Sequence, residues 1–428
     1  MKVEITPANL NGTVKIPPSK SISHRAIIAA SLAQGESIIE NIIMSKDINA
    51  TCDAMKKLGA TITIIDEIKD RKTLIIKGGL SKGKEPIEID SNESGSTLRF
   101  LIPIGSISNR KIIFTGRGKL VERPLDEYYK IFDEQKISYK NNNGNLPLTL
   151  EGCIKPGKYR IKGDISSQFI SGLMFVLPLL EGDSTIEIDG VLESKGYVNM
   201  TIDVLRQFGV EIINKEDKVF TIKGLQKYIS RRYKAEGDFS QAAFWLVAGA
   251  IGGEITCEDI NIDSLQGDKE IIEIMKKMKA DIRIVGKDKI TVKKSQTYSL
   301  DIDGSQIPDI IPILSVLGAL SEGKSSVYNA LRLRIKESDR IKSTTSELTK
   351  LGSLIDEKKD GLTVQGKKYL DGGNVTSWND HRIAMSMAIA SIRCKDKITI
   401  EGAESVEKSY PNFWNDFKNL GGKLEIKE

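Results

Sequence analysis

Six short stretches of the chain combine hydroxyl, amide, acidic and basic residues, and each stands directly before an apolar run. They are Lys20–Arg25, Asn92–Arg99, Asp164–Gln168, Glu236–Gln241, Ser305–Asp309 and Trp378–Arg382. If the apolar runs are buried helices, each start presents unpaired N–H groups and roughly half a positive charge. Helix starts of this kind bind anions. The pattern therefore predicts a site for a small ligand that carries several negative charges.

The first of these stretches allows two interpretations. Pro17 and Pro18 stop the preceding segment, and Lys20 and Arg25 add two positive charges to the first turn of an apolar helix. The simpler alternative is ordinary helix capping by Ser19 or Ser21, with Lys20 and Arg25 exposed to solvent. The alternative suffices for one helix alone, so the functional interpretation depends on the other five starts.

Two charged segments lie outside the helix starts. For Arg117 and Lys119 we expect ordinary solvated side chains. The segment Leu331–Arg340 alternates basic and apolar residues, which predicts a strand followed by the start of a helix. Its Lys336, Glu337 and Arg340 would bind an anion and keep a proton donor or acceptor nearby.

The elements that must position these residues repeat along the chain. After each apolar run comes a turn and a short β-branched strand, at intervals of roughly 70 to 75 residues; these copies begin at Ala33, Ile107, Glu181, Gly252, Glu322 and Cys394. An amphipathic helix then follows, usually ended by glycine as at Gly59. Each unit is therefore expected to contain a buried helix, a strand, an amphipathic helix and further strand.

Six α/β units divide naturally into two domains of three. The basic segment Ser230–Lys234 predicts the border, and the strand before Pro17 is expected to pair with the last units. The predicted domains are 19–234 and a discontinuous one made of 1–18 and 235–428, with the site in the cleft between them.

Composition narrows the class of protein. The 428 residues include 63 basic and 58 acidic side chains, so the net charge of +5 favours anionic ligands only mildly. The four cysteines lie far apart and the chain has two histidines, so neither a metal site nor a disulfide framework is expected. We expect four buried thiols, no membrane segment and a cytoplasmic location.

Read in order, the motifs resemble those of 5-enolpyruvylshikimate-3-phosphate (EPSP) synthases, which are enolpyruvyl transferases. The matching motifs are P-P-S-K-S-I-S-H-R from Pro17, E-S-G-S-T-L-R from Glu93, E-R-P from Glu122, S-S-Q-F from Ser166, S-K-G-Y from Ser194, I-P-D from Ile307, L-R-I-K-E-S-D-R from Leu333, N-D-H-R from Asn379 and V-E-K-S-Y-P from Val406. The resemblance implies two domains of three βαβαββ repeats, with parallel helices buried and sheets outside, as in an inside-out α/β barrel.

The resemblance also implies a reaction. The enolpyruvyl group of phosphoenolpyruvate would pass to the 5-hydroxyl of shikimate 3-phosphate with release of phosphate, without a metal or organic cofactor. The residues implied for shikimate 3-phosphate are Lys20, Ser21, Arg25, Ser166, Ser167, Gln168, Ser194, Tyr197, Asp309, Arg332 and Lys336. Those implied for phosphoenolpyruvate are Lys20, Gly95, Arg123, Gln168, Arg340, Arg382 and Lys408. Arginine suits carboxylate and phosphate because its guanidinium group binds them bidentately.

This chemistry needs a base for the hydroxyl and an acid for the methylene carbon. As a hypothesis, Asp309 acts on the hydroxyl and Glu337 on the carbon, while Lys20 and Lys408 assist on the phosphate side. Asp309 could equally be the N-cap of the helix that begins at Ile310. His381 is expected to be a structural residue beside Arg382.

Two other functions remain as alternatives. UDP-N-acetylglucosamine enolpyruvyl transferases share the fold and reaction, but they carry a cysteine in the loop that corresponds to Gly116–Pro124, and this loop has none. A non-enzymatic six-repeat clamp around DNA would need basic residues spread over its inner helices, whereas these helices are apolar. We therefore expect small-molecule substrates, no nucleic acid and a monomer.

Overall fold

The computed structural model describes residues 1–66, 70–81 and 83–427. Its internal contacts divide the chain into two compact units: Pro18–Ala235, here called the central unit, and Met1–Pro17 with Glu236–Glu428, here called the terminal unit. These borders lie one residue from those expected from the sequence. The chain thus passes twice from one unit to the other.

The second repeat shows the unit of construction in continuous sequence. Its elements are β6 (Ile87–Asp90), α3 (Gly95–Ser106), β7 (Ile112–Thr115), α4 (Asp126–Gln135), β8 (Ser138–Asn142) and β9 (Asn145–Glu151). Strand β6 pairs in parallel with β7, and β9 pairs antiparallel with both β7 and β8. The result is a four-stranded sheet in the order β6-β7-β9-β8.

The other two repeats of the central unit have the same sheet pattern. The first consists of α1 (Lys20–Leu32), β3 (Glu36–Ile43), α2 (Lys46–Lys57), β4 (Thr61–Asp66) and β5 (Arg71–Lys77), and it takes its parallel strand from β14 (Arg232–Lys234). The third consists of β10 (Lys158–Lys162), α5 (Ser167–Val176), β11 (Ser184–Asp189), α6 (Lys195–Gln207), β12 (Ile212–Lys215) and β13 (Val219–Ile222). A strand from the end of this unit therefore completes the sheet at its beginning.

The terminal unit repeats the pattern three more times. The fourth repeat comprises β2 (Asn11–Lys15), α7 (Phe239–Gly252), β15 (Glu254–Glu258), α8 (Ile271–Lys277), β16 (Asp281–Val285) and β17 (Lys289–Lys293). The fifth comprises β18 (Asp301–Asp303), α9 (Ile311–Ala319), β19 (Lys324–Tyr328), α10 (Arg340–Lys350), β20 (Leu354–Lys358) and β21 (Gly361–Gln365). The sixth comprises β22 (Gly373–Thr376), α11 (His381–Ala390), β23 (Ile398–Glu401), α12 (Phe413–Asn419), β24 (Lys423–Lys427) and β1 (Lys2–Thr6).

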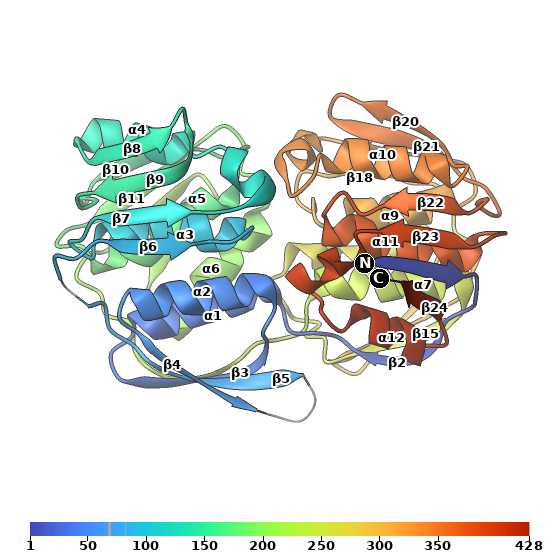
Figure 1. The fold of residues 1–428 in the computed structure, drawn as a ribbon, viewed down its shortest axis with the longest axis horizontal. Helices are drawn as coiled ribbons and strands as arrows, with labels where there is room; N and C mark the ends of the chain where they lie inside the picture. Colours follow the sequence, from blue (N-terminus) through green and yellow to red (C-terminus); the bar gives the residue numbers. More distant parts are fainter. Residues whose placement is uncertain (67–69, 82, 428) are drawn as a thin grey trace. The chain divides into compact units, whose positions relative to one another are not determined.

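Strand β1, like β14, departs from sequence order. It lies between β23 and β24 and pairs antiparallel with both, so the blue N-terminal arrow stands among the red elements of the last repeat (Figure 1). Val3 and Ile5 point into the core, and Lys2 and Glu4 point outward. The first residues of the chain are therefore an internal part of the last sheet.

The first helix of each repeat lies in the core, because its own side chains are apolar nearly all round. Every residue of α7, α9 and α11 is buried, and these three helices contact one another. In the central unit, α3 packs against both α1 and α5. The sheets alternate buried and exposed residues, as expected for sheets with one face to solvent. The predicted fold class, a mixed α/β protein of repeated units with buried helices and outer sheets, is confirmed.

Two details differ from the sequence predictions. The segment Leu331–Ile335 is a 3₁₀ helix, η4, and the predicted strand is wrong. Strand β19 ends at Tyr328, Asn329 turns the chain with a φ of 53°, and the sheet already has four strands. The expectation of four buried thiols is also wrong, because Cys153 is exposed; the other three cysteines are buried and all four are free.

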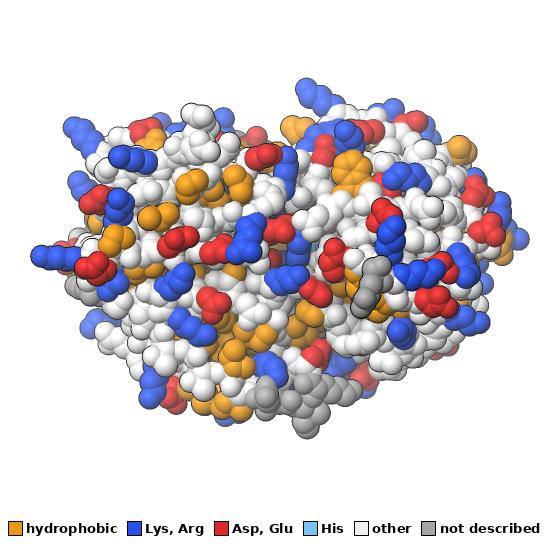
Figure 2. Space-filling view, viewed as in Figure 1, with side chains coloured by type: hydrophobic (Ala, Val, Ile, Leu, Met, Phe, Trp, Pro, Cys, Tyr) orange, Lys and Arg blue, Asp and Glu red, His pale blue; other side chains and the backbone are white. Residues whose placement is uncertain are grey.

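Basic and acidic side chains are interspersed over the face seen in Figure 2, and hydrophobic side chains appear there only in small groups. Arg117 bonds to Asp90 and Lys119 to Glu122 on the surface, at 2.7 and 2.8 Å. Within the described residues, no helix has the length and apolar character needed to cross a membrane.

The position of β1 predicts a stability effect at the chain's beginning. We expect Ile5→Ala to lower the free energy of unfolding by about 2–5 kcal/mol, because it opens a cavity under the last sheet. Lys2→Ala is the matched control, since Lys2 is 54% exposed and makes one surface ion pair with Glu401, and its effect should stay within about 0.5 kcal/mol. Urea unfolding of both variants measures the difference, and equal effects would contradict the assigned role of β1.

Candidate active site

A buried arginine organises the polar end of the terminal unit. Arg340, the first residue of α10, is 1% exposed and donates hydrogen bonds to three carboxylates. Its Nε lies 2.8 Å from Asp380 Oδ2, its Nη1 2.7 Å from Asp309 Oδ1 and its Nη2 2.7 Å from Glu337 Oε2. Burial opposes the charge, but the three carboxylates outweigh it and raise the pKa of Arg340 well above its usual value. Arg340 is therefore a permanent cation that holds the three acids in place.

The three carboxylates have different surroundings. Asp380 is fully buried; it accepts the N–H of Arg382 as the N-cap of α11 and the hydroxyl of Ser338 at 3.0 Å. Asp309 and Glu337 keep 19% and 21% of their side-chain surface exposed. Asp380 is thus fixed inside the protein, whereas Asp309 and Glu337 are partly exposed to solvent.

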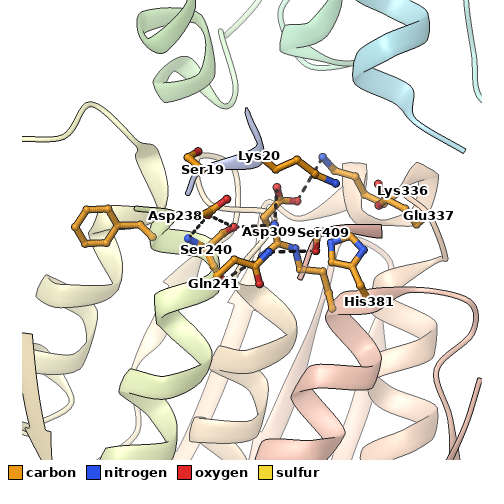
Figure 3. A network of polar contacts seen from close by, with 12 residues as sticks. Ser19, Lys20, Asp238, Ser240, Gln241, Asp309, Lys336, Glu337, His381 and Ser409 are labelled. Carbon is orange, nitrogen blue, oxygen red and sulfur yellow. Dashed lines mark hydrogen bonds and ion pairs between the residues drawn. The ribbon is translucent and has the colours of Figure 1, made fainter. Parts of the chain in front are cut away.

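Asp309 lies among three basic groups. Besides Arg340, the Nη2 atom of Arg382 lies 3.4 Å from Asp309 Oδ2, and Lys336 Nζ lies 3.9 Å from Oδ1. Figure 3 shows Asp309 and Lys336 joined by this contact. The alternative role of Asp309 as an N-cap is wrong, because the cap position of α9 is Ile310 and no side chain caps it. Its carboxylate is instead held by cations.

The first turn of α7 supports two further predicted residues. Arg382 donates to the carbonyl and hydroxyl oxygens of Ser240 at 3.1 and 2.9 Å. Gln241, the next residue, donates to the hydroxyl of Ser409, which follows Lys408 (Figure 3). Lys408 ends the 3₁₀ helix η6 (Ala403–Lys408), and its Nζ donates to the carbonyl of Asn379 at 2.6 Å. Arg382 is therefore bound directly to the start of α7, and Ser409, the residue after Lys408, is bound to it as well.

Lys336 is the titratable cation of this group. Burial lowers its pKa to about 8. The negative charge of Asp309 opposes this shift, whereas the positive charges of Arg332 and Arg340 add to it. Arg332 is itself buried and donates to the carbonyl of Ser305 in the loop before α9. Lys336 therefore changes charge just above neutral pH.

In the central unit, Arg25 connects α1 with α6. It donates to Thr201 Oγ1 at 2.7 Å and to the carbonyls of Ser21 and Tyr197 at 2.8 and 3.1 Å. Burial lowers its pKa to about 10, so the side chain remains charged at neutral pH. Arg25 thus brings the predicted residues Ser21 and Tyr197 to one place.

The starts of α3 and α5 meet through Gln168. Its amide donates to Ser96 Oγ at 3.0 Å, and its carbonyl accepts from Arg99 Nη1 at 2.9 Å. Ser166 caps α5 by accepting the N–H of Gln168, and Ser167 is the first residue of that helix. Both predicted serines therefore adjoin Gln168.

Gly95 permits a close approach at the start of α3. A Cβ atom at this position would lie 2.7 Å from Arg123 Nη1, so a side chain here would displace the guanidinium group. Ser194, which precedes α6, is buried with a left-handed φ of 52°. Lack of space for a side chain therefore constrains position 95, and the left-handed backbone constrains position 194.

Lys20 differs from the solvated residue of the simpler interpretation. Ser19 does cap α1, but the Lys20 side chain is largely buried and its Nζ lies 2.7 Å from Asp47 Oδ2. Behind this pair, His24 Nδ1 bonds to Thr51, Thr51 to Thr97 and Thr97 to Ser94. Burial lowers the pKa of His24 well below its usual value, so His24 is neutral. A line of neutral hydrogen bonds thus joins α1, α2 and α3.

Comparison with known proteins identifies the family. The sequence profile of EPSP synthase (3-phosphoshikimate 1-carboxyvinyltransferase) matches residues 5–417. The chain belongs to the EPSP synthase family. Proteins named 3-phosphoshikimate 1-carboxyvinyltransferase from Clostridium acetobutylicum and Clostridium novyi are 57% and 55% identical to it, over 99% of this chain and 98% of each relative. The structure of an EPSP synthase from Acinetobacter baumannii, 25% identical, superposes over the full length of both chains with a TM-score of 0.81.

Within each unit of this EPSP synthase family member, most predicted residues form contact groups. In the terminal unit, Asp309, Lys336, Glu337, Arg340 and Arg382 form one continuous group. In the central unit, Gly95 adjoins Arg123, and Ser21, Arg25 and Tyr197 adjoin one another. Lys20, the residue before Ser21, pairs with Asp47.

The sequence patterns gave no individual role to the residues that hold these groups, although three of the four lie within the predicted polar helix starts. The most important are Asp380, Asp47, Arg99 and Ser240, which contact Arg340, Lys20, Gln168 and Arg382 respectively. All four stand in or next to a helix start. At such positions the sequence does not distinguish a residue that caps the helix from one that binds a distant side chain. Among the described residues, no group of three or more histidine, cysteine or acidic side chains could hold a metal ion.

The lowered pKa of Lys336 predicts a pH-dependent stability. Between pH of about 8 and the ordinary value of 10.5, the unfolded chain binds a proton at Lys336 that the folded protein releases, so unfolding takes up a proton. The free energy of unfolding therefore rises with pH across this window. Relative to wild type, Lys336→Met should lose about 1–3 kcal/mol of this rise, measured by urea unfolding at pH 7.5, 9 and 10.

Lys395→Met is the matched control. Lys395 is exposed, and its hydrogen bond to Asp371 raises its pKa, so it stays charged through the same window. Identical pH profiles for the two variants would show that Lys336 is not desolvated.

Proposed function

We propose that this EPSP synthase family member transfers the enolpyruvyl group of phosphoenolpyruvate to the 5-hydroxyl of shikimate 3-phosphate, releasing phosphate. The observation that carries the proposal is the carboxylate of Asp309, which lies half-buried among Arg340, Arg382 and Lys336. A carboxylate held in this way is a positioned base, and the cations around it attract anionic substrates. Both substrates are multiply charged anions, so the residue types fit them.

Phosphoenolpyruvate needs cations for its phosphate and its carboxylate. We assign Lys20, Arg123, Arg340, Arg382 and Lys408 to these charges, with Gly95 and Gln168 contributing uncharged groups. Arg340 and Arg382 are held rigidly by buried partners, so they offer planar, oriented donors. Gly95 leaves its backbone N–H open to a ligand oxygen because it has no side chain.

Shikimate 3-phosphate needs a second anion site and donors for its ring hydroxyls. Hydroxyl and amide groups from Ser21, Ser166, Ser167, Gln168, Ser194 and Tyr197 suit the ring and phosphate. Arg25, Lys20, Lys336 and Arg332 supply positive charge, and Asp309 accepts from the reacting hydroxyl.

The reaction is an addition followed by an elimination. Asp309 takes the proton of the 5-hydroxyl while the hydroxyl oxygen bonds to the central carbon of phosphoenolpyruvate. Glu337 gives a proton to the methylene carbon, which becomes a methyl group. In the second half the methyl group returns a proton to Glu337. The bond from the central carbon to the phosphate oxygen breaks, and the double bond forms again. Lys20 and Lys408 stabilise the departing phosphate, which leaves with the proton taken from the hydroxyl.

A cytoplasmic monomer completes the proposal. Four free cysteines, three of them buried, suit a reducing compartment. Interspersed surface charges and small apolar groups on the visible face suit a protein without a permanent partner.

The direct test is phosphate release from phosphoenolpyruvate by the purified protein. We expect release with shikimate 3-phosphate as acceptor and none with UDP-N-acetylglucosamine. The loop Gly116–Pro124, which contains the 3₁₀ helix η1 (Gly118–Glu122), has no cysteine, in keeping with this choice. Release with the second acceptor alone would overturn the proposal.

Glu337 can be tested separately by isotope exchange. In D₂O with shikimate 3-phosphate present, the wild-type protein should place deuterium in the methylene group of phosphoenolpyruvate, because the methyl group formed in the addition rotates before it loses a proton as the addition reverses. Glu337→Gln removes the acid, so turnover should fall about 10²–10⁴-fold and exchange should fall with it.

Glu357→Gln is the control for this substitution, because Glu357 also pairs with an arginine, Arg334 at 2.7 Å, but on the surface. It should exchange at the wild-type rate. Undiminished exchange in Glu337→Gln would mean that another group protonates the carbon.

A further inference from the structure

The turn that precedes α11 has an unusual backbone. Trp378 and Asn379 both have a φ of 54°, so two consecutive residues other than glycine adopt the left-handed conformation. Asparagine tolerates this region, whereas a bulky aromatic residue there is an outlier that persists only if surrounding contacts hold it. We call residues 376–380 the Trp378 turn.

A buried glutamate supplies those contacts. Glu347 of α10 is fully buried, and its Oε1 accepts the indole N–H of Trp378 at 2.7 Å. Its Oε2 accepts the backbone N–H of Thr376 at 2.9 Å, and Lys350 Nζ lies 2.9 Å from both oxygens. One carboxylate therefore binds the turn at two points, and a neighbouring lysine balances its charge.

The opposite side of the turn is fixed by Ser377. Its backbone N–H donates to the backbone carbonyl of Glu401 at 2.9 Å, and its hydroxyl accepts the N–H of Asn379 at 3.1 Å. Gly402, with a φ of 70°, permits close packing here, because a Cβ at this position would lie 2.6 Å from Ser377 Oγ. The turn is thus held between α10 and the segment that leads into η6.

The Trp378 turn aims two groups at the proposed phosphoenolpyruvate residues. The carbonyl of Asn379 accepts Lys408 Nζ at 2.6 Å. The next residue, Asp380, binds Arg340 at 2.8 Å and caps α11 through the N–H of Arg382. A change in the turn would therefore move the partners of Lys408, Arg340 and Arg382 together.

We propose that Glu347 and Trp378 are positioning residues for phosphoenolpyruvate: their hydrogen bond holds the Trp378 turn, which sets the places of Lys408 and Arg340. The inference rests on the proposed function, since it assigns these cations to phosphoenolpyruvate. Neither Glu347 nor Trp378 contacts the substrate in this scheme. Both act through the backbone between them and the cations.

The test compares Trp378→Phe, Glu347→Gln and the double variant in steady-state kinetics. Trp378→Phe removes the indole N–H but keeps an aromatic ring. Loss of a hydrogen bond to a charged group predicts that KM for phosphoenolpyruvate rises about tenfold, while KM for shikimate 3-phosphate changes less than about twofold. The double variant should lose no more than the worse single variant, because both substitutions act through the same turn.

Glu4→Gln is the control for the loss of an acidic side chain. Glu4 lies in β1, and its side chain bonds to Lys397 and Lys427, each at 2.7 Å. We expect it to leave both KM values unchanged. Equal rises of the two KM values in Trp378→Phe, or a loss of activity that only follows the folded fraction, would reduce Glu347 and Trp378 to structural residues and overturn the inference.

A second measurement does not depend on turnover. Lys408 should react faster with an amine-acetylating reagent in Trp378→Phe than in wild type, because its Nζ loses the fixed carbonyl of Asn379, while Lys336 should react at the wild-type rate. Peptide mass analysis separates the two lysines. An unchanged rate at Lys408 overturns the inference even if the wild-type protein proves inactive with shikimate 3-phosphate, which would be a failure of the proposed function alone.

Discussion

The burial of the Arg340 guanidinium group is the constraint on which the terminal unit's polar end depends. A charge taken out of water loses several kcal/mol of solvation unless carboxylates and hydrogen bonds replace the solvent. Asp380, Asp309 and Glu337 do so, and they arrive from the start of α11, the loop before α9 and the residues before α10. The requirement to neutralise one arginine thus brings three separate segments to one point. Arg382, Lys336 and Lys408 add three further cations, so the group keeps a positive excess of one.

The repeat explains why such segments can meet at all. Within a unit, each repeat places its first helix after a strand in the same way, so the buried helices run in the same direction. Helices that contact one another therefore begin at the same end of the unit. Arg382 at the start of α11 touches Ser240 at the start of α7 and Asp309 before α9. In the central unit, Gln168 of α5 touches Ser96 of α3 in the same way. Three repeats therefore build one polar end from three helix starts, although the residues lie far apart in sequence.

Much of this organisation could be predicted from the sequence, because it rests on patterns with a fixed period. The six buried helices and the strands after them could be predicted from apolar runs. One such run is Ile311–Ala319, which forms a helix with every residue buried. One prediction of secondary structure was wrong, at Leu331–Ile335. Its alternating L-R-L-R-I sequence is typical of a strand, but the neighbouring sheet already has four strands, and Arg334 binds Asp339 and Glu357.

The partners within the site were harder to predict than its members. Lys20, Arg340 and Glu337 stand out by type and position, whereas Asp47, Asp380 and Glu347 have the appearance of ordinary capping or helix residues. Their importance comes from burial and from contacts across the chain, such as the 27 positions that separate Lys20 from Asp47. A single sequence shows which residues are polar at a helix start, but it does not show which pairs will touch.

The insertion of β1 between β23 and β24 has a consequence for synthesis on the ribosome. Residues 18–235 contain every strand of the central unit, so that unit can fold while the rest is still being made. Strand β1 emerges first but finds its second neighbour only when Lys423–Lys427 has been translated. At about 5–20 residues per second, this delay is on the order of tens of seconds. Throughout it, β1 lacks its second neighbour, and the charged Lys2 and Glu4 along it disfavour pairing with other chains.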